Sequence, residues 1–224
     1  MTAPSTYLSN ALAAQHEPIR VIPNGIDTSR YTHRTRVQPR PSLVWLRALH
    51  TIYNPLMAVQ VVARLRDRFP DITLRMIGPA KDGSQHAVRA EIDALGLAHI
   101  VTLEGAIPKD AVPAALDAAD IFINTTNVDN TPVSVIEAMA AGLCVVSTDA
   151  GGLRDLLTDE VDALLVPIGD VEAMAAAVAR ILGDTSVAER ISRNGDVVAE
   201  RSAWPEVMAA WTALLDDVTQ RAAA

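Results

Sequence analysis

The sequence contains a single cysteine, Cys144, among 224 residues. This excludes an intrachain disulfide and a metal site built from cysteines. No apolar run reaches the roughly 20 residues that a membrane-spanning helix needs, and the amino terminus lacks the basic and apolar regions of a secretory signal. These absences predict a cytoplasmic protein without a membrane span. Peripheral attachment to a membrane would have to come through a partner domain.

Lysine is also scarce, because only Lys81 and Lys109 occur beside seventeen arginines. The net charge is -8, and no stretch gathers basic residues on the scale that indicates nucleic-acid binding. The sequence lacks a G-x-G-x-x-G motif and a P-loop, which disfavours a nicotinamide dehydrogenase and a P-loop NTPase. No His/Cys spacing typical of a metal site occurs either.

Apolar runs of strand length recur along the chain. Most are continuous rather than alternating, which predicts strands that are covered on both faces, as in a parallel sheet. Helical patterns fall between them, and this alternation favours βαβ units. We therefore predict an α/β fold, a single Rossmann-like domain with a parallel sheet and helices on both faces. The expected strands are 19–23, 42–47, 72–78, 100–105, 120–125, 143–148 and 163–167.

The two ends of the chain fall outside this pattern. Residues 1–18 suggest a short helix detached from it, and residues 204–224 predict an amphipathic helix. The regular domain is expected to cover residues 19–203. The apolar stripe of the last helix comprises Val207, Trp211, Leu214, Leu215 and Val218. Both ends are expected to pack against something else.

The stretch 129–142, "DNTPVSVIEAMAAG", places one carboxylate, Glu137, among apolar residues. It follows a predicted strand, so its helix should begin at the carboxyl end of the sheet, where open α/β sheets bind ligands. Thr131 suits the N-cap, Pro132 the first helical position and Gly142 the position after the end. The free N–H groups there favour an anion such as a phosphate. Glu137 itself fits two roles equally well: a ligand-hydroxyl acceptor, or a structural carboxylate that pairs with an arginine or faces solvent.

A resemblance shifts this balance. The segment "TPVSVIEAMAAGLCVVSTDAGGLRDLL" resembles the carboxyl-terminal half of family-4 glycosyltransferases of the GT-B fold. These enzymes carry two acidic residues separated by seven positions, the second followed by Ala-Met-Ala-x-Gly. Glu137 matches the second acid, and Asp129 stands where the family usually has Glu. Further segments that match in the same order are 21–31, 42–65, 74–79 and 101–126.

The resemblance implies catalytic roles for three residues. Glu137 would hold the ribose hydroxyls of a nucleotide sugar, and Asp129 would contact the donor sugar or its phosphates. Arg47 would neutralise the diphosphate leaving group. The family usually has a Lys about five residues after this Arg, but residues 48–54 are "ALHTIYN" and contain none. His50 or an arginine from elsewhere is the candidate replacement.

The remaining donor contacts are implied in the same way. The backbone around Thr131, Pro132 and Val133 would cradle the diphosphate. Gly105 and Ile107, in the turn after "VTLEG", would lie against the nucleobase. No metal and no cofactor are implied, because the donor substrate, a nucleoside-diphosphate sugar, would meet its phosphate charge at Arg47 and the helix terminus.

The function that follows is that of the donor-binding half of a retaining glycosyltransferase, which transfers a sugar to a hydroxyl acceptor. GT-B enzymes have two Rossmann-like domains, and the first supplies the acceptor site. Here residues 1–18 resemble the last segment before the second domain, and the final helix resembles the one that crosses back. The expected partners are a nucleotide sugar and either a missing acceptor-binding domain, a partner chain or a second copy.

Two alternatives stay open. The missing Lys and the missing first domain favour a non-catalytic nucleotide-sugar-binding subunit that needs another chain. A nucleotide-sugar epimerase of similar architecture is the weaker alternative, because the Glu-Ala-Met-Ala-x-Gly stretch favours the transferase.

Overall fold

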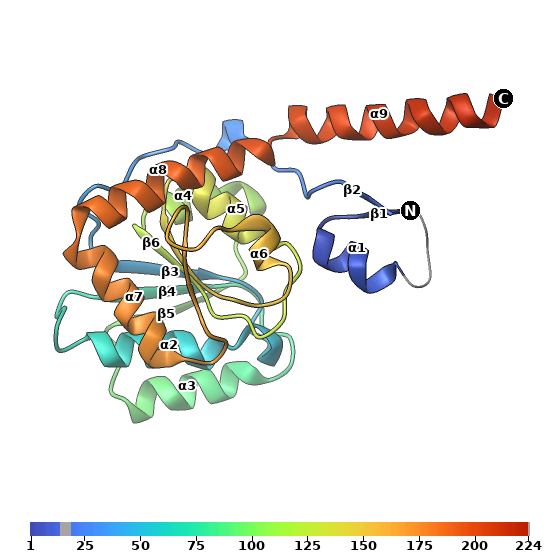
Figure 1. Cartoon of the computed structure of the whole chain (residues 1–224). Helices are drawn as coiled ribbons and strands as arrows, with labels where there is room; N and C mark the ends of the chain where they lie inside the picture. The colour runs from blue at the N-terminus through green and yellow to red at the C-terminus, as the bar shows by residue number, and fades with distance from the viewer. Residues whose placement is uncertain (14–18, 224) are drawn as a thin grey trace.

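A six-stranded parallel sheet forms the centre of the molecule, which we describe from a computed structural model covering residues 1–13 and 19–223 (Figure 1). The strand order is β5-β4-β3-β6-β7-β8, and every pairing is parallel. The single α/β domain with a parallel sheet is therefore confirmed. Its strands are β3 (Ser42–Leu46), β4 (Thr73–Ile77), β5 (Val101–Gly105), β6 (Ile121–Asn124), β7 (Cys144–Thr148) and β8 (Leu164–Val166).

The strand expected at 19–23 does not join this sheet, so that prediction is wrong. Only Arg20–Val21 (β2) is extended, and it pairs in parallel with Thr2–Ala3 (β1) in a separate two-stranded sheet. Both residues of β2 are exposed. An apolar run favours an extended conformation, but it does not specify the pairing partner, and here the amino-terminal residues provide it.

Helices cover both faces of the large sheet, as predicted (Figure 1). Alternate residues of one strand enter opposite layers, since Leu43 and Trp45 of β3 pack in one core cluster and Val44 in the other. The first cluster lies under α2 (Pro55–Leu65), α3 (Ser84–Ala94) and α7 (Val171–Gly183). The second lies under α4 (Val112–Asp117), α5 (Val133–Ala140) and α6 (Leu153–Leu156), and α8 (Thr185–Arg201) contributes to both.

Particular residues define the helix ends. Pro55 opens α2, and the Asp170 carboxylate caps α7 by accepting a hydrogen bond from the Ala173 N–H at 2.8 Å. Gly142 follows α5 with φ +76°, as predicted. The N-cap assigned to Thr131 and the first helical position assigned to Pro132 are each wrong by one residue, because Pro132 holds the capping position and α5 begins at Val133 without a side-chain cap.

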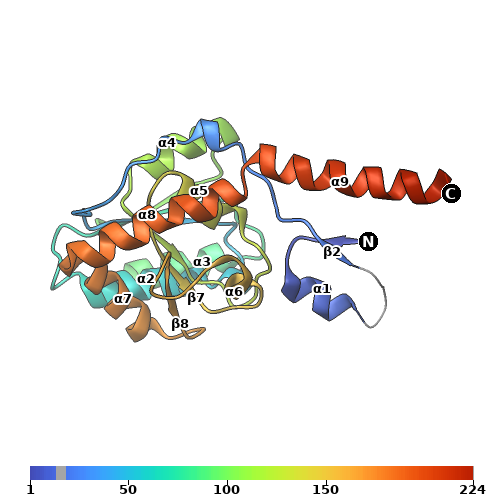
Figure 2. The ribbon, with the colours of Figure 1, turned by 45° about the horizontal axis from the view of Figure 1, so that its top comes forward.

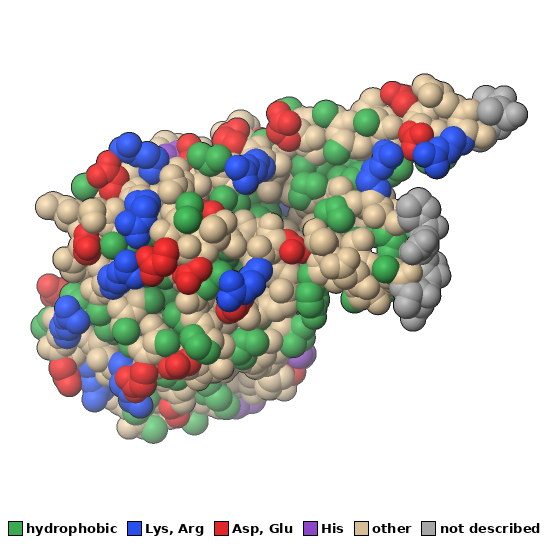
Figure 3. Space-filling model, viewed as in Figure 1, with side chains coloured by type: hydrophobic (Ala, Val, Ile, Leu, Met, Phe, Trp, Pro, Cys, Tyr) green, Lys and Arg blue, Asp and Glu red, His purple; other side chains and the backbone are tan. Residues whose placement is uncertain are grey.

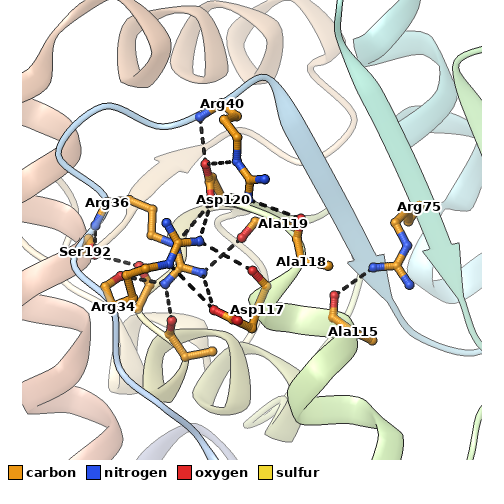
Figure 4. Close-up of polar contacts among 12 residues, drawn as sticks. Arg34, Arg36, Arg40, Arg75, Ala115, Asp117, Ala118, Ala119, Asp120 and Ser192 are labelled. Atoms are coloured by element: carbon orange, nitrogen blue, oxygen red, sulfur yellow. Dashed lines mark hydrogen bonds and ion pairs between the residues drawn. The ribbon is translucent and has the colours of Figure 1, made fainter.

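The polar segment 33–41 is a loop that carries a fully buried arginine (Figure 4). The Arg36 guanidinium contacts Asp120 at 3.3 Å and donates to the Ala119 carbonyl at 3.1 Å. Asp120 also accepts from Arg34 and Arg40, each at 2.9 Å. Burial opposes its charged form, but the hydrogen bonds from Arg40 and Arg34 outweigh this and hold the pKa of Asp120 well below its usual range. The cluster ties the loop before β3 to the start of β6.

The two ends of the chain lie beside each other, to one side of the main sheet (Figures 1 and 2). The amino-terminal piece consists of β1, α1 (Thr6–Leu12) and β2, and the carboxyl-terminal helix is α9 (Trp204–Ala223). Arg20 of β2 pairs with Asp217 of α9 at 3.1 Å. Residues 14–18 of the predicted amino-terminal segment lie outside the described residues.

Helix α9 keeps most of its apolar stripe on the surface. Val207 is buried, but Trp211, Leu215 and Val218 are exposed, as is Met208 outside the stripe. Figure 3 shows hydrophobic side chains on this helix and between it and the amino-terminal piece. In the part of the chain that the structure describes, no helix is both long and apolar enough to cross a membrane.

Candidate functional site

The predicted site residues gather at one edge of the sheet. Arg47 follows β3, Gly105 ends β5, and residues 129–133 connect β6 to α5. Because β3, β5 and β6 run in the same direction, their carboxyl ends share this edge. In open α/β sheets the ligand binds in the crevice outside such an edge.

Glu137 is buried on α5, with 8% of its surface exposed. The Tyr31 hydroxyl donates a hydrogen bond to Glu137 Oε1 at 2.8 Å. Burial raises the pKa of Glu137, while this hydrogen bond and the charges of Lys109 and Arg30 oppose the increase. Among the described residues no arginine or lysine lies within ion-pair distance of Glu137, so the structural pairing that the sequence left open is not formed.

A cavity of about 270 Å³ opens next to this carboxylate. Glu137 and Val133 of α5 line it together with Tyr31, Arg30 and Lys109. The Arg30 guanidinium donates to the Lys109 carbonyl at 3.0 Å, which holds these two basic residues together. The rest of the lining comprises Gly25, Ile26, Asp27 and Trp204. The cavity thus offers two carboxylates, Glu137 and Asp27, and two cations to a ligand that has both hydroxyls and negative charge.

Arg47 and Asp129 are brought together by the ends of two adjacent strands. Their side chains form a close ion pair that is mostly buried. The Arg47 guanidinium also lies over the Tyr53 ring, 4.1 Å from its centroid. Burial lowers the pKa of Arg47, and the neighbouring Tyr53 opposes that decrease. The predicted phosphate-binding cation therefore already has a carboxylate partner.

Gly151 and Gly152 hold the loop that carries Asp129. A Cβ on Gly151, whose φ is +57°, would lie 2.1 Å from the Asp129 carbonyl oxygen. A Cβ on Gly152 would lie 2.4 Å from the Asn130 carbonyl oxygen. The Gly152 N–H also donates to the Asp129 carbonyl at 3.1 Å. Only glycine permits this close approach of the two backbones.

The amino-terminal piece holds the same loop from the other side. The Thr131 hydroxyl donates to the Pro4 carbonyl at 3.3 Å, and the Asn24 side-chain amide donates to the Thr131 carbonyl at 3.0 Å. Thr131 is therefore used in tertiary contacts rather than in capping α5. The contacts of Tyr31 and Asn24 were not predicted from the sequence.

The remaining predicted residues lie nearby, without a direct contact to Glu137. Gly105 has φ +74°, and its carbonyl accepts from the Gly78 N–H at 2.8 Å. Ile107 is partly buried against the second core cluster, two residues before Lys109 of the cavity. Neither Gly105 nor Ile107 lines the cavity itself.

His50 caps a short helix. Its Nδ1 accepts a hydrogen bond from the Ile52 N–H at 3.1 Å at the start of the helix Thr51–Tyr53. The same nitrogen lies 3.8 Å from Asp82. In the described part of the chain, no group of three or more His, Cys, Asp or Glu side chains is placed to hold a metal ion.

The parallel sheet with helices on both faces defines an α/β domain of the Rossmann type. A family model described as glycosyl transferases group 1 matches residues 40–184, and the chain belongs to that family. It is 29% identical over 193 residues to a 2-deoxystreptamine glucosyltransferase of Streptomyces kanamyceticus, covering 80% of this chain and 49% of the relative. It is 28% identical to an MMP alpha-(1->4)-mannosyltransferase of Mycolicibacterium hassiacum, covering 55% of that protein.

Solved structures of GT-B enzymes share the fold. Anabaena HepE, in complex with UDP and glucose, matches with a TM-score of 0.84 and 22% identity, over 98% of this chain and 62% of that one. The C-terminal domain of a group 1 glycosyl transferase, LpcC of Francisella tularensis, matches with a TM-score of 0.68 and 17% identity, over 79% and 97% of the two chains. The present chain spans about half the length of the curated relatives that it matches.

Proposed function

We propose that this chain is the donor-binding half of a retaining glycosyltransferase that takes its sugar from a nucleoside diphosphate. The observation that carries the proposal is the carboxylate of Glu137. It is buried beside a cavity with two basic residues, and only its Oε1 accepts a hydrogen bond from the described residues. Oε2 is left to accept from ligand hydroxyls, and ribose offers two adjacent ones.

The diphosphate has its own binding groups in this proposal. The backbone at Thr131–Val133 precedes α5, whose first N–H groups have no partner within the helix. Arg47 supplies a planar guanidinium, which suits phosphate oxygens. When the bond from the sugar to the diphosphate breaks, negative charge grows on the leaving group, and fixed donors stabilise it. Asp129, which pairs with Arg47, would contact the donor sugar or its phosphates.

The acceptor site belongs to another domain or chain in this proposal. The support is the chain's coverage of about half of its relatives, together with the exposed apolar side chains of α9. The cytoplasmic location stays a prediction from the sequence. That Anabaena HepE was solved with UDP and with UDP-glucose supports, but does not establish, a nucleotide-sugar donor here.

Titration calorimetry of the full chain with UDP, GDP and ADP tests the donor site. We expect one of the three to bind, and Glu137→Gln to weaken it by roughly 1–3 kcal/mol, the typical loss for hydrogen bonds to a charged group. Glu172→Gln is the matched control, because Glu172 lies on α7 with 71% of its side chain exposed. Binding of none of the three, or equal affinity in the Glu137 variant and the control, contradicts the proposal.

A non-catalytic nucleotide-sugar-binding subunit is the second candidate, and the Arg47–Asp129 ion pair favours it. The one predicted phosphate cation is already paired, and residues 48–54 lack the Lys that the family usually has. Transfer assays with and without a first domain from a relative separate the two candidates. Turnover by the chain alone contradicts the proposal of a non-catalytic subunit. Absence of turnover both without and with the added first domain contradicts the proposal of a transferase.

A further inference from the structure

Tyr31 is the one described side chain that hydrogen-bonds to the Glu137 carboxylate, although the two residues lie 106 positions apart in sequence. We propose that Tyr31 is a positioning residue for the donor site, which holds Oε1 of Glu137 so that Oε2 faces the hydroxyl pair of a ribonucleotide. The inference rests on the proposed role of Glu137 in binding ribose.

Packing fixes the position of Tyr31. Its ring packs against the second core cluster, and its backbone N–H donates to the Thr28 carbonyl at 3.0 Å. The preceding residue, Arg30, is tied to the Lys109 carbonyl. These contacts therefore hold the Tyr31 side chain and its hydroxyl in one position, as a positioning role requires.

The hydrogen bond also determines how the two oxygens of Glu137 are used. A carboxylate has two oxygens, and a hydrogen-bond donor held at one of them restricts rotation of the carboxylate about the Cγ–Cδ bond. Hydrogen bonds to an ionised acceptor are stronger than neutral ones. Without the Tyr31 hydroxyl the Glu137 carboxylate would be free to rotate. Binding of a diol would then have to order the carboxylate, and this entropic cost would lower the affinity.

The surrounding charges are consistent with a neutral hydroxyl beside an ionised carboxylate. Burial, followed by the hydrogen bond to Glu137, raises the pKa of Tyr31 far above its ordinary value, so the hydroxyl keeps its proton. Arg30 and Lys109 are the basic groups that face Glu137, and Asp27 is the acidic group near Tyr31. Burial raises the pKa of Glu137, and the Tyr31 hydrogen bond is the largest effect that opposes the increase.

Tyr31→Phe removes the hydroxyl and keeps the ring in the core. The ligand pair is the nucleoside diphosphate that binds best and its 2′,3′-dideoxy form, which lacks the two hydroxyls. We expect the affinity for the ribonucleotide to fall about 3- to 10-fold, in line with the cost of ordering one freed side chain. Affinity for the dideoxy form should not change, so the selectivity between the two ligands should fall by the same factor.

The pH profile provides the second readout. The ribose hydroxyls donate to a charged carboxylate, so binding is lost as pH falls through the pKa of Glu137. Since the Tyr31 hydrogen bond lowers that pKa, Tyr31→Phe should move the acidic midpoint of ribonucleotide binding to higher pH. A tyrosine that only packs would leave this midpoint unchanged. Tyr7→Phe is the matched control, because Tyr7 is exposed on α1.

Glu137→Gln separates the two levels of the proposal. If it leaves ribonucleotide selectivity unchanged, the ribose role of Glu137 is wrong. If it abolishes selectivity while Tyr31→Phe keeps the wild-type selectivity and midpoint, the donor site stands and Tyr31 is not a positioning residue. A fall in selectivity together with an upward shift of the midpoint in Tyr31→Phe, absent from Tyr7→Phe, supports the inference.

Discussion

Arg47 and Asp129, which are 82 positions apart, form a close and mostly buried ion pair at the carboxyl edge of the sheet. Arg47 follows β3 and Asp129 lies in the loop after β6, and these two strands are neighbours in the sheet. A diphosphate that binds to Arg47 must compete with a carboxylate that is already in place. The ion pair therefore sets the affinity of the site for negative charge.

Asp129→Asn should tighten the binding of a nucleoside diphosphate without its sugar. The amide has nearly the same shape but no charge, so Arg47 is released and a repulsion with the phosphates disappears. We expect an increase in affinity of about 3- to 10-fold, because a partly buried like-charge contact costs on the order of 1 kcal/mol. Calorimetric titration with UDP or GDP measures it.

The same change at Asp67, whose side chain is 98% exposed, controls for the general effect of removing one negative charge. If Asp129→Asn binds the diphosphate more weakly than the wild-type chain does, Asp129 is a ligand group rather than a competitor. Because Asp129→Asn leaves Arg47 without its carboxylate partner, added salt should weaken diphosphate binding more steeply in this variant than in Arg47→Ala, which removes the cation altogether.

Gly151→Ala should disrupt the loop that carries Asp129. The added Cβ would lie 2.1 Å from the Asp129 carbonyl oxygen, and the residue would keep a φ of +57° that disfavours alanine. We expect a loss of roughly 1–3 kcal/mol in the free energy of unfolding and a weaker diphosphate affinity. Urea denaturation and titration measure the two effects.

Gly169→Ala separates strain from collision, because Gly169 has φ +76° but no atom within 4 Å of the added Cβ. It should lose stability from the backbone conformation alone and keep its ligand affinity. Equal losses of stability in the two variants, with affinity kept in both, would show that the close approach at Gly151 does not matter.

The sequence predicted the large sheet better than the contacts that complete the site. Continuous apolar runs identified all six strands, because strands buried on both faces have few polar positions. Glu137 stood out as a single carboxylate in an apolar helix. The run at 19–23 misled, since its apolar residues are extended but pair with residues 2–3.

Tyr31 and Arg36 could not be found in this way. Both lie in loop sequence, and their partners are 106 and 84 positions away, so no local pattern indicates the contact. The one available signal was the spacing of Arg34, Arg36 and Arg40 within a short polar segment, which is unusual for a plain connection. Thr131 shows the opposite error: a local pattern was present but misleading. Its hydroxyl could cap a helix, but it donates to the Pro4 carbonyl instead.

Asp120→Asn should destabilise the fold more than any change at the site. It would leave the fully buried Arg36 with only the exposed Asp117, at 3.5 Å, as a counter-charge, and breaking a buried pair from one side costs about 3–5 kcal/mol. In the wild-type chain the depressed pKa of Asp120 gives stability that is present above its unfolded value and lost as pH falls toward the folded one. Urea denaturation from pH 6 down to about pH 3 should therefore show a decline in the free energy of unfolding that starts near the ordinary aspartate pKa of about 4.

This decline should be shallower in Asp120→Asn. The control variant Asp117→Asn, whose side chain is 59% exposed beside the same arginines, should keep the decline. Equal stability and equal acid dependence in the two variants would contradict the structural role of Asp120.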